Sequence, residues 1–223
     1  TAPKTSAAAV NLDIRNLALS RNRMSILPKQ DVKADFSAKV HRGAGLIGSK
    51  FQQPEVTIQS SMARGKFSAT LFQLNPGESL PTADNLLIDG NFNLQQISNL
   101  LRNFKKLPPS TRLAGTTHIQ SSGSVDAQHL VLNSTRIDTR NFRYHDGEKA
   151  LSDDRLVLET EGKLNFETKS ARFAPITIDG SAGTITIPQL TINDWSDLQK
   201  DMKTQAKAQL DLAKLTRSYG DFI

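Results

Sequence analysis

The stretch that decides the fold is "RLVLETEGKLNFE", residues 155–167. Its leucines and Phe166 alternate with arginine, glutamate and lysine. Because successive side chains of an extended strand point to opposite sides, one face of this strand is apolar and the other is charged. The stretch therefore predicts a β-strand with one buried and one solvated face.

The same alternation recurs along most of the chain. In "KADFSAKV", residues 33–40, apolar side chains again occupy every second position. Turn signals such as Asn75-Pro76-Gly77, Asp89-Gly90 and Asp179-Gly180 separate the runs. Connections this short leave no room for helical crossovers, so the pattern predicts an antiparallel meander. Further strand-like runs lie at 55–59, 86–94, 112–120, 128–132, 135–144 and 173–179.

A glycine-rich stretch, "HRGAGLIGSK" at residues 41–50, spells the G-x-G-x-x-G fingerprint of dinucleotide-binding folds. That fingerprint needs a helix directly after the glycines, because the helix N-terminus holds the pyrophosphate. Here Pro54 and an alternating run follow instead, and no acidic residue between Val56 and Gly77 is available to bind a ribose. The glycines therefore predict a hairpin connection between two strands.

Two segments have helical character. Residues 94–105 place their leucines, an isoleucine and Phe104 on one stripe, and the pattern stops before Pro108. A second helix is expected to begin at Asn193 or Asp194 and to continue through Met202. The sequence thus predicts a mostly β fold with one to three short amphipathic helices.

The chain contains an internal repeat. "FNLQQISNLLRNF" at 92–104 aligns with "LDLAKLTRSYGDF" at 210–222, an offset of 118 residues (210 − 92), which pairs Asn93 with Asp211. Such self-similarity is typical of architectures whose units stack edge to edge. We therefore expect a flexible linker at 1–9 and a single repetitive segment at 10–223, with related units at about 10–91 and 92–209 and the start of a third at 210–223.

The composition narrows the classes of function. The 28 basic and 22 acidic residues give a net charge of +6, but they are scattered, so we expect a solvated surface and no nucleic-acid partner. The absence of cysteine excludes thiolate metal sites, cysteine nucleophiles and disulfides. The apolar runs are too short to span a bilayer. Because the chain starts with a linker-like segment and no Met, we expect a processed chain or a piece of a longer protein.

The sequence predicts no catalytic, metal or cofactor site. The four histidines stand singly, without the spacing that gathers a metal ion. Asp153 and Asp154 are adjacent and are predicted to form a solvated turn, not an acid–base pair. No G-x-S-x-G elbow accompanies the many serines. We therefore expect a protein that is not an enzyme.

The order of segments resembles the AsmA-like family of bacterial envelope proteins, which includes AsmA and TamB. The resemblance is carried by "LPPSTRLAGTTHIQSSG" (107–123), "LVLNSTRIDTRNFRYHDG" (130–147), "LVLETEGKLNFETKSARFAPITIDGSAGTITIPQLTI" (156–192) and "LDLAKL" (210–215). It covers residues 84–223 well and 10–83 more loosely. It implies a long twisted antiparallel sheet folded into an open apolar groove. No catalytic residue comes with it.

The resemblance also implies a function and a location. Such proteins are periplasmic, are anchored in the inner membrane, here through parts of the parent protein outside this chain, and carry phospholipids towards the outer membrane. The alternative is an envelope or surface β-sandwich module that binds a protein or glycan, because one-sided strands also pack against a second sheet. The candidate lipid-groove residues are Ala34, Phe36, Ala38, Val40, Phe67, Ala69, Leu71, Leu156, Leu158, Leu164, Phe166, Ile176, Ile178, Ile185 and Ile187.

Overall fold

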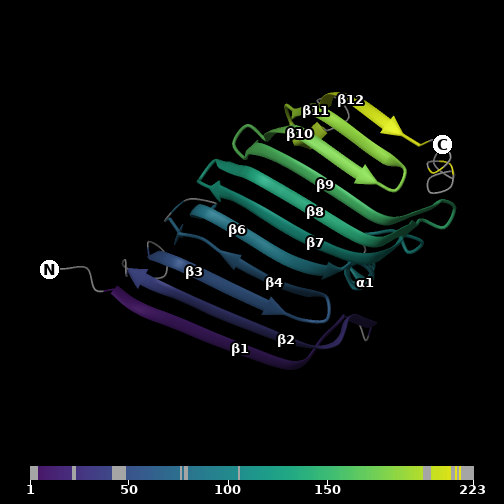
Figure 1. Cartoon of the computed structure of the whole chain (residues 1–223). Coiled ribbons are helices and arrows are strands. Elements are labelled where there is room, and N and C mark those ends of the chain that lie inside the picture. Colours follow the sequence, from purple (N-terminus) through teal and green to yellow (C-terminus); the bar gives the residue numbers. More distant parts are fainter. Residues whose placement is uncertain are drawn as a thin grey trace.

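In the computed structural model, the described residues form one large antiparallel sheet of 12 strands (Figure 1). The structure describes residues 5–21, 24–41, 49–75, 77, 80–104, 106–197, 202–211, 214 and 216. Neighbours in the sheet are neighbours in the chain, except that the short strand β5 shares a position with β4 between β3 and β6. The mostly β fold with a long antiparallel meander is therefore confirmed.

The elements follow one another with short connections. The N-terminal part contains β1 (Thr5–Arg21), β2 (Met24–His41), β3 (Lys50–Gln59), β4 (Ala63–Ser68), β5 (Leu71–Gln73) and β6 (Thr82–Asn93). The helix α1 (Leu94–Asn103) joins β6 to β7 (Arg112–Val125). The remaining elements are β8 (His129–His145), β9 (Ala150–Asn165), β10 (Ser170–Gly180), β11 (Gly183–Ile192), the 3-10 turn η1 (Trp195–Asp197) and β12 (Met202–Leu210).

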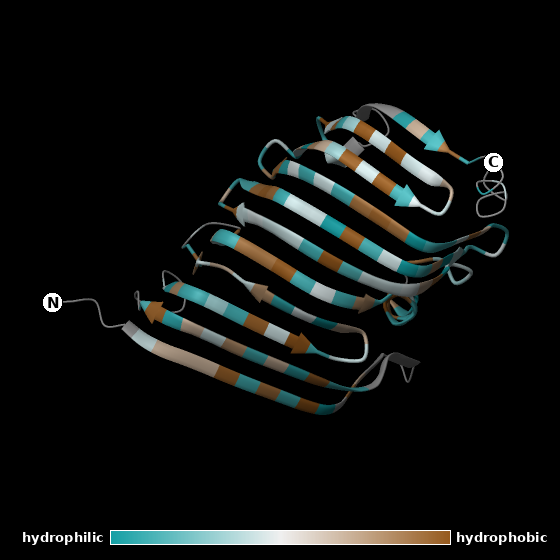
Figure 2. Ribbon diagram, viewed as in Figure 1, coloured by the Kyte–Doolittle hydropathy of each residue, from teal (hydrophilic) through white to brown (hydrophobic). Residues whose placement is uncertain are grey.

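The register lines up mostly apolar side chains in rows that run from β1 to β11. Residues directly opposite each other on paired strands point to the same side. Following these pairs from strand to strand gives continuous rows, and hydropathy accordingly alternates along most strands (Figure 2). We call the side that carries two of these rows the apolar face. One row is Val10, Phe36, Val56, Phe67, Ile88, Ser121, Thr135, Thr160, Ile176, Ile187, and the next is Leu12, Ala34, Ile58, Gly65, Gly90, Ile119, Ile137, Leu158, Ile178, Ile185.

The opposite side, which we call the charged face, carries the residues in between. One of its rows is Asn11, Asp35, Thr57, Lys66, Asp89, Gln120, Arg136, Glu159, Thr177, Thr186, and a second is Asp13, Lys33, Gln59, Arg64, Asn91, His118, Asp138, Val157, Asp179, Thr184.

Bulges bend the sheet along one line. Register shifts fall at 53–54 on β3, 84–85 on β6, 133–134 on β8, 174–175 on β10 and 187–188 on β11. Except for β10 and β11, the strands that carry these shifts are separated by one intervening strand, and we call the shifted positions the bulge row. Because a bulge bends its strand and increases the local twist, a row of bulges curves the sheet across its whole width. The curvature is visible in Figure 1.

The helix α1 confirms the expected helix, although it ends at Asn103. The side chain of Asn93 accepts a hydrogen bond from the backbone N–H of Gln96, which satisfies one of the free donors of the first turn. The buried Ser98 faces β7, where its Oγ accepts a hydrogen bond from the N–H of Leu113 at 3.2 Å. The helix is therefore fixed to the sheet by both of its neighbouring strands.

The structure corrects three expectations. Residues 5–9, predicted as part of a linker, pair with β2 as the start of β1. Asp89-Gly90, predicted as a turn, lies inside β6, where Gly90 is opposite Gly65 and lets the two backbones approach closely. Met202, predicted to be helical, begins the strand β12, and the described part of the predicted helix forms the short turn η1. In each case pairing with a neighbouring strand outweighs the local preference.

Several predicted features lie outside the described residues. These are residues 1–4, residues 42–48 of the glycine-rich stretch and most of the predicted third unit. The strands on either side of the glycines, β2 and β3, are antiparallel neighbours with His41 opposite Lys50. This pairing rules out the parallel strands of a dinucleotide-binding unit at that position.

Candidate functional site

The apolar face carries most of the candidate groove residues. The register places the residues of β2, β9, β10 and β11 on this face as expected. Val10, Leu12, Val56, Ile58, Ile119 and Ile137 share it but are not among the candidates. The sequence signal that could have identified these six residues is the alternation of apolar and polar residues on their own strands. The candidates placed on this face are Ala34, Phe36, Ala38, Val40, Phe67, Leu156, Leu158, Leu164, Ile176, Ile178, Ile185 and Ile187.

An aromatic cluster occupies the N-terminal half of this face. The rings of Phe36 and Phe51 lie 6.1 Å apart edge to face, and those of Phe51 and Phe72 lie 6.2 Å apart. Phe67 lies 6.5 Å from Phe72, again edge to face. These distances and angles are those that aromatic pairs prefer. The cluster joins strands β2 to β5 into one continuous apolar surface.

Leu71 is a correction to the candidate list. It lies opposite Gln52 and Asp84, on the charged face, and Phe72 takes the place expected for it, opposite Phe51 and Ala83. The cause is the break between β4 and β5, which shifts the alternation by one residue. Ala69 lies in that break, is buried, and donates its N–H to the carbonyl of Pro54.

Phe166 occupies a different position from the other candidates. It follows the last residue of β9, and its N–H donates to the carbonyl of Gln128. Its ring packs edge to face against Trp195 of η1, with 5.8 Å between the ring centroids. Phe166 therefore joins the end of the β9–β10 hairpin to the chain that follows β11.

No second layer covers the apolar face within the described part of the chain. Among these residues, the main contacts between elements join neighbouring strands, and α1 contacts β7, β2 and β6. Val10 and Leu12 are 58% and 50% exposed, and Ile58 is 46% exposed. A sandwich would bury such side chains between two sheets about 10 Å apart.

Paired hydroxyls interrupt the apolar face on β7 and β8. The hydroxyls of Thr117 and Thr139 lie 2.9 Å apart, and those of Ser121 and Thr135 lie 2.8 Å apart. In each pair the two hydroxyls bond to each other, which avoids the free-energy cost of leaving an unpaired hydroxyl in an apolar environment. Sequence alternation alone did not identify these pairs, because they form between strands.

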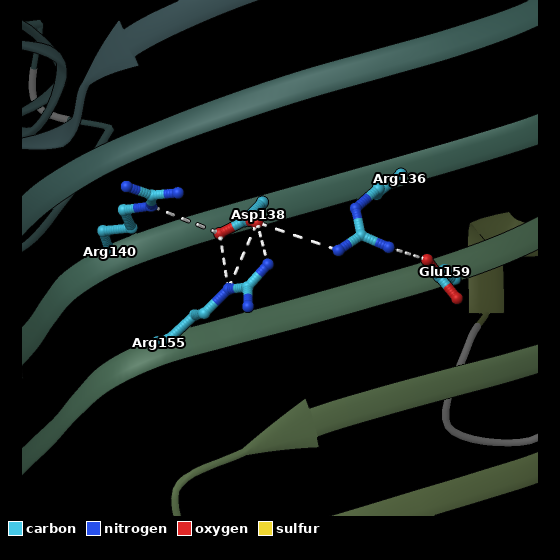
Figure 3. A network of polar contacts seen from close by, with 5 residues as sticks. All are labelled: Arg136, Asp138, Arg140, Arg155 and Glu159. Carbon is cyan, nitrogen blue, oxygen red and sulfur yellow. Dashed lines mark hydrogen bonds and ion pairs between the residues drawn. The ribbon is translucent and has the colours of Figure 1, made fainter.

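A network of arginine and carboxylate side chains lies on the charged face (Figure 3). Asp138, which is 16% exposed, accepts hydrogen bonds from Arg155, the shortest 2.6 Å from Nη2 to Oδ2. Arg136 and Arg140 approach the same carboxylate at 3.8 and 4.0 Å, and Arg136 also pairs with Glu159. The hydrogen bond from Arg155 lowers the pKa of Asp138, and the same bond raises the pKa of Arg155. Both shifts favour the charged forms of Asp138 and Arg155.

The charged face is hollowed at this network. A hollow of about 350 Å³ is lined by residues of β6, β7 and β8 that include His118, Arg136 and Asp138. His118 Nε2 lies 3.2 Å from Asp89, and Gln120 donates to the same carboxylate at 3.0 Å. Because the acids here already accept bonds from their neighbours, we interpret these contacts as joining adjacent strands.

The described residues do not group metal ligands. Among the residues that can be described, no three His, Asp or Glu side chains come close enough to hold an ion. His129 Nδ1 lies 3.2 Å from Asp126, whose pKa is lowered by the backbone N–H groups of Gln128 and His129. This pair belongs to the turn between β7 and β8.

The structure also corrects the prediction for Asp153. It was predicted to lie in a solvated turn, but it is 3% exposed and lies inside β9. Its carboxylate accepts hydrogen bonds from the N–H and Oγ of Ser181, at 3.0 and 3.1 Å, and from the N–H of Arg155. Asp153 thus fixes the turn between β10 and β11.

Comparison with known proteins adds no relative. No protein-family model matches the chain, and neither a curated protein nor a solved structure matches it significantly. The described helices include none that is long and apolar enough to cross a membrane. The function must therefore be argued from the two faces of the sheet.

Proposed function

We propose that the apolar face binds acyl chains of phospholipids, in a periplasmic segment of an AsmA-like envelope protein. Membrane attachment would come from parts of the parent protein outside this chain. The observation that carries the proposal is a wide apolar face that no second layer covers within the described residues. Burying an acyl chain there would gain about 0.8 kcal/mol for each methylene removed from water.

The dimensions of the face suit transport better than storage of one molecule. Ten strand-to-strand spacings separate β1 from β12, which gives roughly 48 Å along the sheet. An acyl chain reaches roughly 15 Å, half the thickness of a bilayer core. The face therefore offers several overlapping positions for one chain, and a lipid can slide from row to row with its headgroup in water.

The side chains of the face support movement without tight capture. Apolar contacts have no fixed direction, so a chain loses little when it moves from Ile58 to Ile119 or Ile137. The hydroxyls of Thr117 and Thr139 bond to each other and need no partner from the lipid. We propose no reaction step and no cofactor, and direction and energy would come from outside this chain.

The β-sandwich alternative receives no support from a specific observation. A sandwich needs two packed sheets, whereas the described residues form a single sheet. A protein or glycan partner would use the same open face or the charged face. The experiment below separates it from a lipid.

Two leucines provide a matched test. Leu12 on the apolar face is 50% exposed, and Leu87, which lies opposite Ser68 and Ser122 on the charged face, is 54% exposed. We would purify wild-type, Leu12→Asp and Leu87→Asp proteins without detergent. Native mass spectrometry and lipid extraction would then measure bound phospholipid.

The proposal predicts phospholipid on the wild type and on Leu87→Asp, and clearly less on Leu12→Asp. Circular dichroism checks that each variant keeps its sheet. A Phe36→Asp variant, in the aromatic cluster, should lose lipid as well. Lipid-free wild-type protein that also refuses a fluorescent phospholipid would overturn the proposal.

A further inference from the structure

A long segment around α1 carries only positive charge. Between Asp89 and Asp126 the chain contains no acidic residue, but it contains Arg102, Lys105, Lys106 and Arg112. This bias is local, because acidic and basic residues alternate over most of the remaining strands. Helix α1 and the loop after it lie within this segment, at one end of the strands (Figure 1).

Apolar side chains are exposed beside these charges. Phe104, directly after α1, is 48% exposed and is one of the most exposed large apolar residues described. Pro108 and Pro109 are also exposed. Lys106, which lies between Phe104 and these prolines in the sequence, is exposed as well. An exposed ring flanked by lysine and arginine is typical of segments that lie in a membrane interface.

The exposed tip is held in place by the helix. The N–H of Phe104 donates to Leu100 at 3.0 Å, and the N–H of Lys106 donates to Leu101 at 2.8 Å. Arg102 donates to the carbonyl of Pro109, which ties the loop back to α1. Because these hydrogen bonds hold Phe104 and Lys106 against α1, binding would cost less conformational entropy than it would for an unattached segment.

We infer that the tip formed by Phe104, Lys106, Pro108 and Pro109 docks on the surface of an anionic lipid bilayer. Phe104 inserts between headgroups, and the exposed Lys106 faces anionic phosphates. Charge complementarity selects this partner: each basic residue near an anionic membrane surface strengthens binding. The exposed side of α1, formed by Gln95, Asn99 and Asn103, adds no negative charge.

Acidic residues of a neighbouring turn lie close to this surface. Gly147, in the turn between β8 and β9, lies beside Ser110, so Asp146 and Glu148 are close to the loop. The Asp146 carboxylate accepts bonds from the N–H groups of Glu148 and Lys149, which directs it into its own turn. The basic tip thus remains open to a membrane.

This inference does not depend on the proposed function. It concerns a tip at one end of the sheet, whereas acyl-chain binding concerns the apolar face. The two together would place the end of an acyl-chain path against a bilayer. Each has its own variants, so either can fail alone.

The test is cosedimentation of the chain with vesicles. We would compare pure phosphatidylcholine with an equal mixture of phosphatidylcholine and phosphatidylglycerol, at low and high salt. Phe104→Ser and Lys106→Glu are the test variants. Leu87→Ser is the matched control, because it removes an equally exposed apolar side chain from the charged face.

The wild type and Leu87→Ser should bind the anionic vesicles and release them at high salt. Lys106→Glu should weaken binding by roughly fivefold or more, and Phe104→Ser by a similar factor. Leu12→Asp, which tests the apolar face, should bind as the wild type does. Equal binding to both vesicle types overturns the inference, and so does unchanged binding by both test variants. A Phe104→Ser variant that alters only self-association would identify the tip as a protein contact and overturn it as well.

Discussion

Arg155 on β9 donates hydrogen bonds to both carboxylate oxygens of Asp138 on β8. Asp138 lies two residues along β8 from Arg140, which is directly opposite Arg155. The same carboxylate lies within 4.0 Å of Arg136 and Arg140, so one acid is shared by three cations. Three arginines gathered on adjacent strands would repel one another without it. Asp138 therefore connects strands β8 and β9 through side-chain contacts on the charged face.

The first prediction concerns the pH dependence of this pair. The folded-state pKa of Asp138 is lowered, so its ionised form stabilises the folded protein. This contribution is present above the unfolded pKa of about 3.9 and is lost as the pH falls through the lower folded pKa. Asp138→Asn should lower the free energy of unfolding by about 0.5–1 kcal/mol at neutral pH.

Urea unfolding at neutral and strongly acidic pH would check this prediction. The difference between wild type and Asp138→Asn should shrink as the pH falls below the folded pKa. Glu161→Gln, which removes an exposed carboxylate on the neighbouring strand β9, is the control and should change little. An Asp138→Asn protein as stable as the wild type at neutral pH would show that the network contributes nothing.

The second prediction concerns Asp153. Its buried carboxylate accepts bonds from Ser181 and from the N–H of Arg155. Asp153→Ala leaves these donors without an acceptor, which should lower the free energy of unfolding by about 2 kcal/mol. The neighbouring Asp154 is exposed, so Asp154→Ala should be close to neutral.

Hydrogen exchange would locate the effect of Asp153→Ala. The amides of Ser181 and Arg155 should exchange faster, because each loses its acceptor. Amides on β1 and β2 lie at the far edge of the sheet. Once the change in global stability is subtracted, their exchange rates should be similar in the wild type and in Asp153→Ala. Equal protection of Ser181 in both variants would contradict the assigned role.

Alternation predicted the sheet because it is a local property. Each strand such as β9 shows its two faces in its own residues, and short turns leave only antiparallel pairing. The misassignment of Leu71 has the opposite origin. The break that moves Phe72 onto the apolar face depends on pairing with Pro54 and Asp84, which no single strand reveals.

The polar residues show the same limit. Asp153 is predicted to be solvated from its own neighbours in sequence, but its partner Ser181 is 28 residues away. The strand β12 has helix-forming residues, and its pairing with β11 decides its conformation. Long-range pairing is therefore what the sequence alone did not provide.

The third prediction concerns Gly162 on the apolar face. Gly162 lies opposite Phe173, whose ring covers it, and a Cβ at this position would come within 2.4 Å of that ring. Gly162→Ala should therefore displace the ring and destabilise the protein by about 1–3 kcal/mol. Chemical denaturation measures this change.

A double-mutant cycle tests the cause. In a Phe173→Ala background, Gly162→Ala should cost less, because the ring that it displaces is gone. The carbonyl of Arg172, 3.0 Å from the added Cβ, sets the residual cost. Additive effects of the two substitutions would show that the ring does not cover Gly162.

The fourth prediction concerns the residues that the repeat aligns, Asn93 and Asp211. Both accept a hydrogen bond from the N–H three residues later, Gln96 and Lys214, each at 3.1 Å. The N–H of Asn93 donates to the carbonyl of Met62, and the N–H of Asp211 donates to the carbonyl of Ala182. Each acceptor is the residue just before a neighbouring strand. The division into two units stays a prediction, but these shared contacts make it testable at one position.

Removing either side chain should have a similar effect. Asn93→Ala and Asp211→Ala should each lower the free energy of unfolding by about 1 kcal/mol, because a free N–H loses its acceptor. Asn93→Asp and Asp211→Asn, which exchange the two residue types, should keep most of the stability. Gln95→Ala, on the exposed side of α1, is the control for helix propensity. If Asp211→Ala has no effect while Asn93→Ala destabilises, the two positions are not equivalent, and the repeat does not extend to this contact.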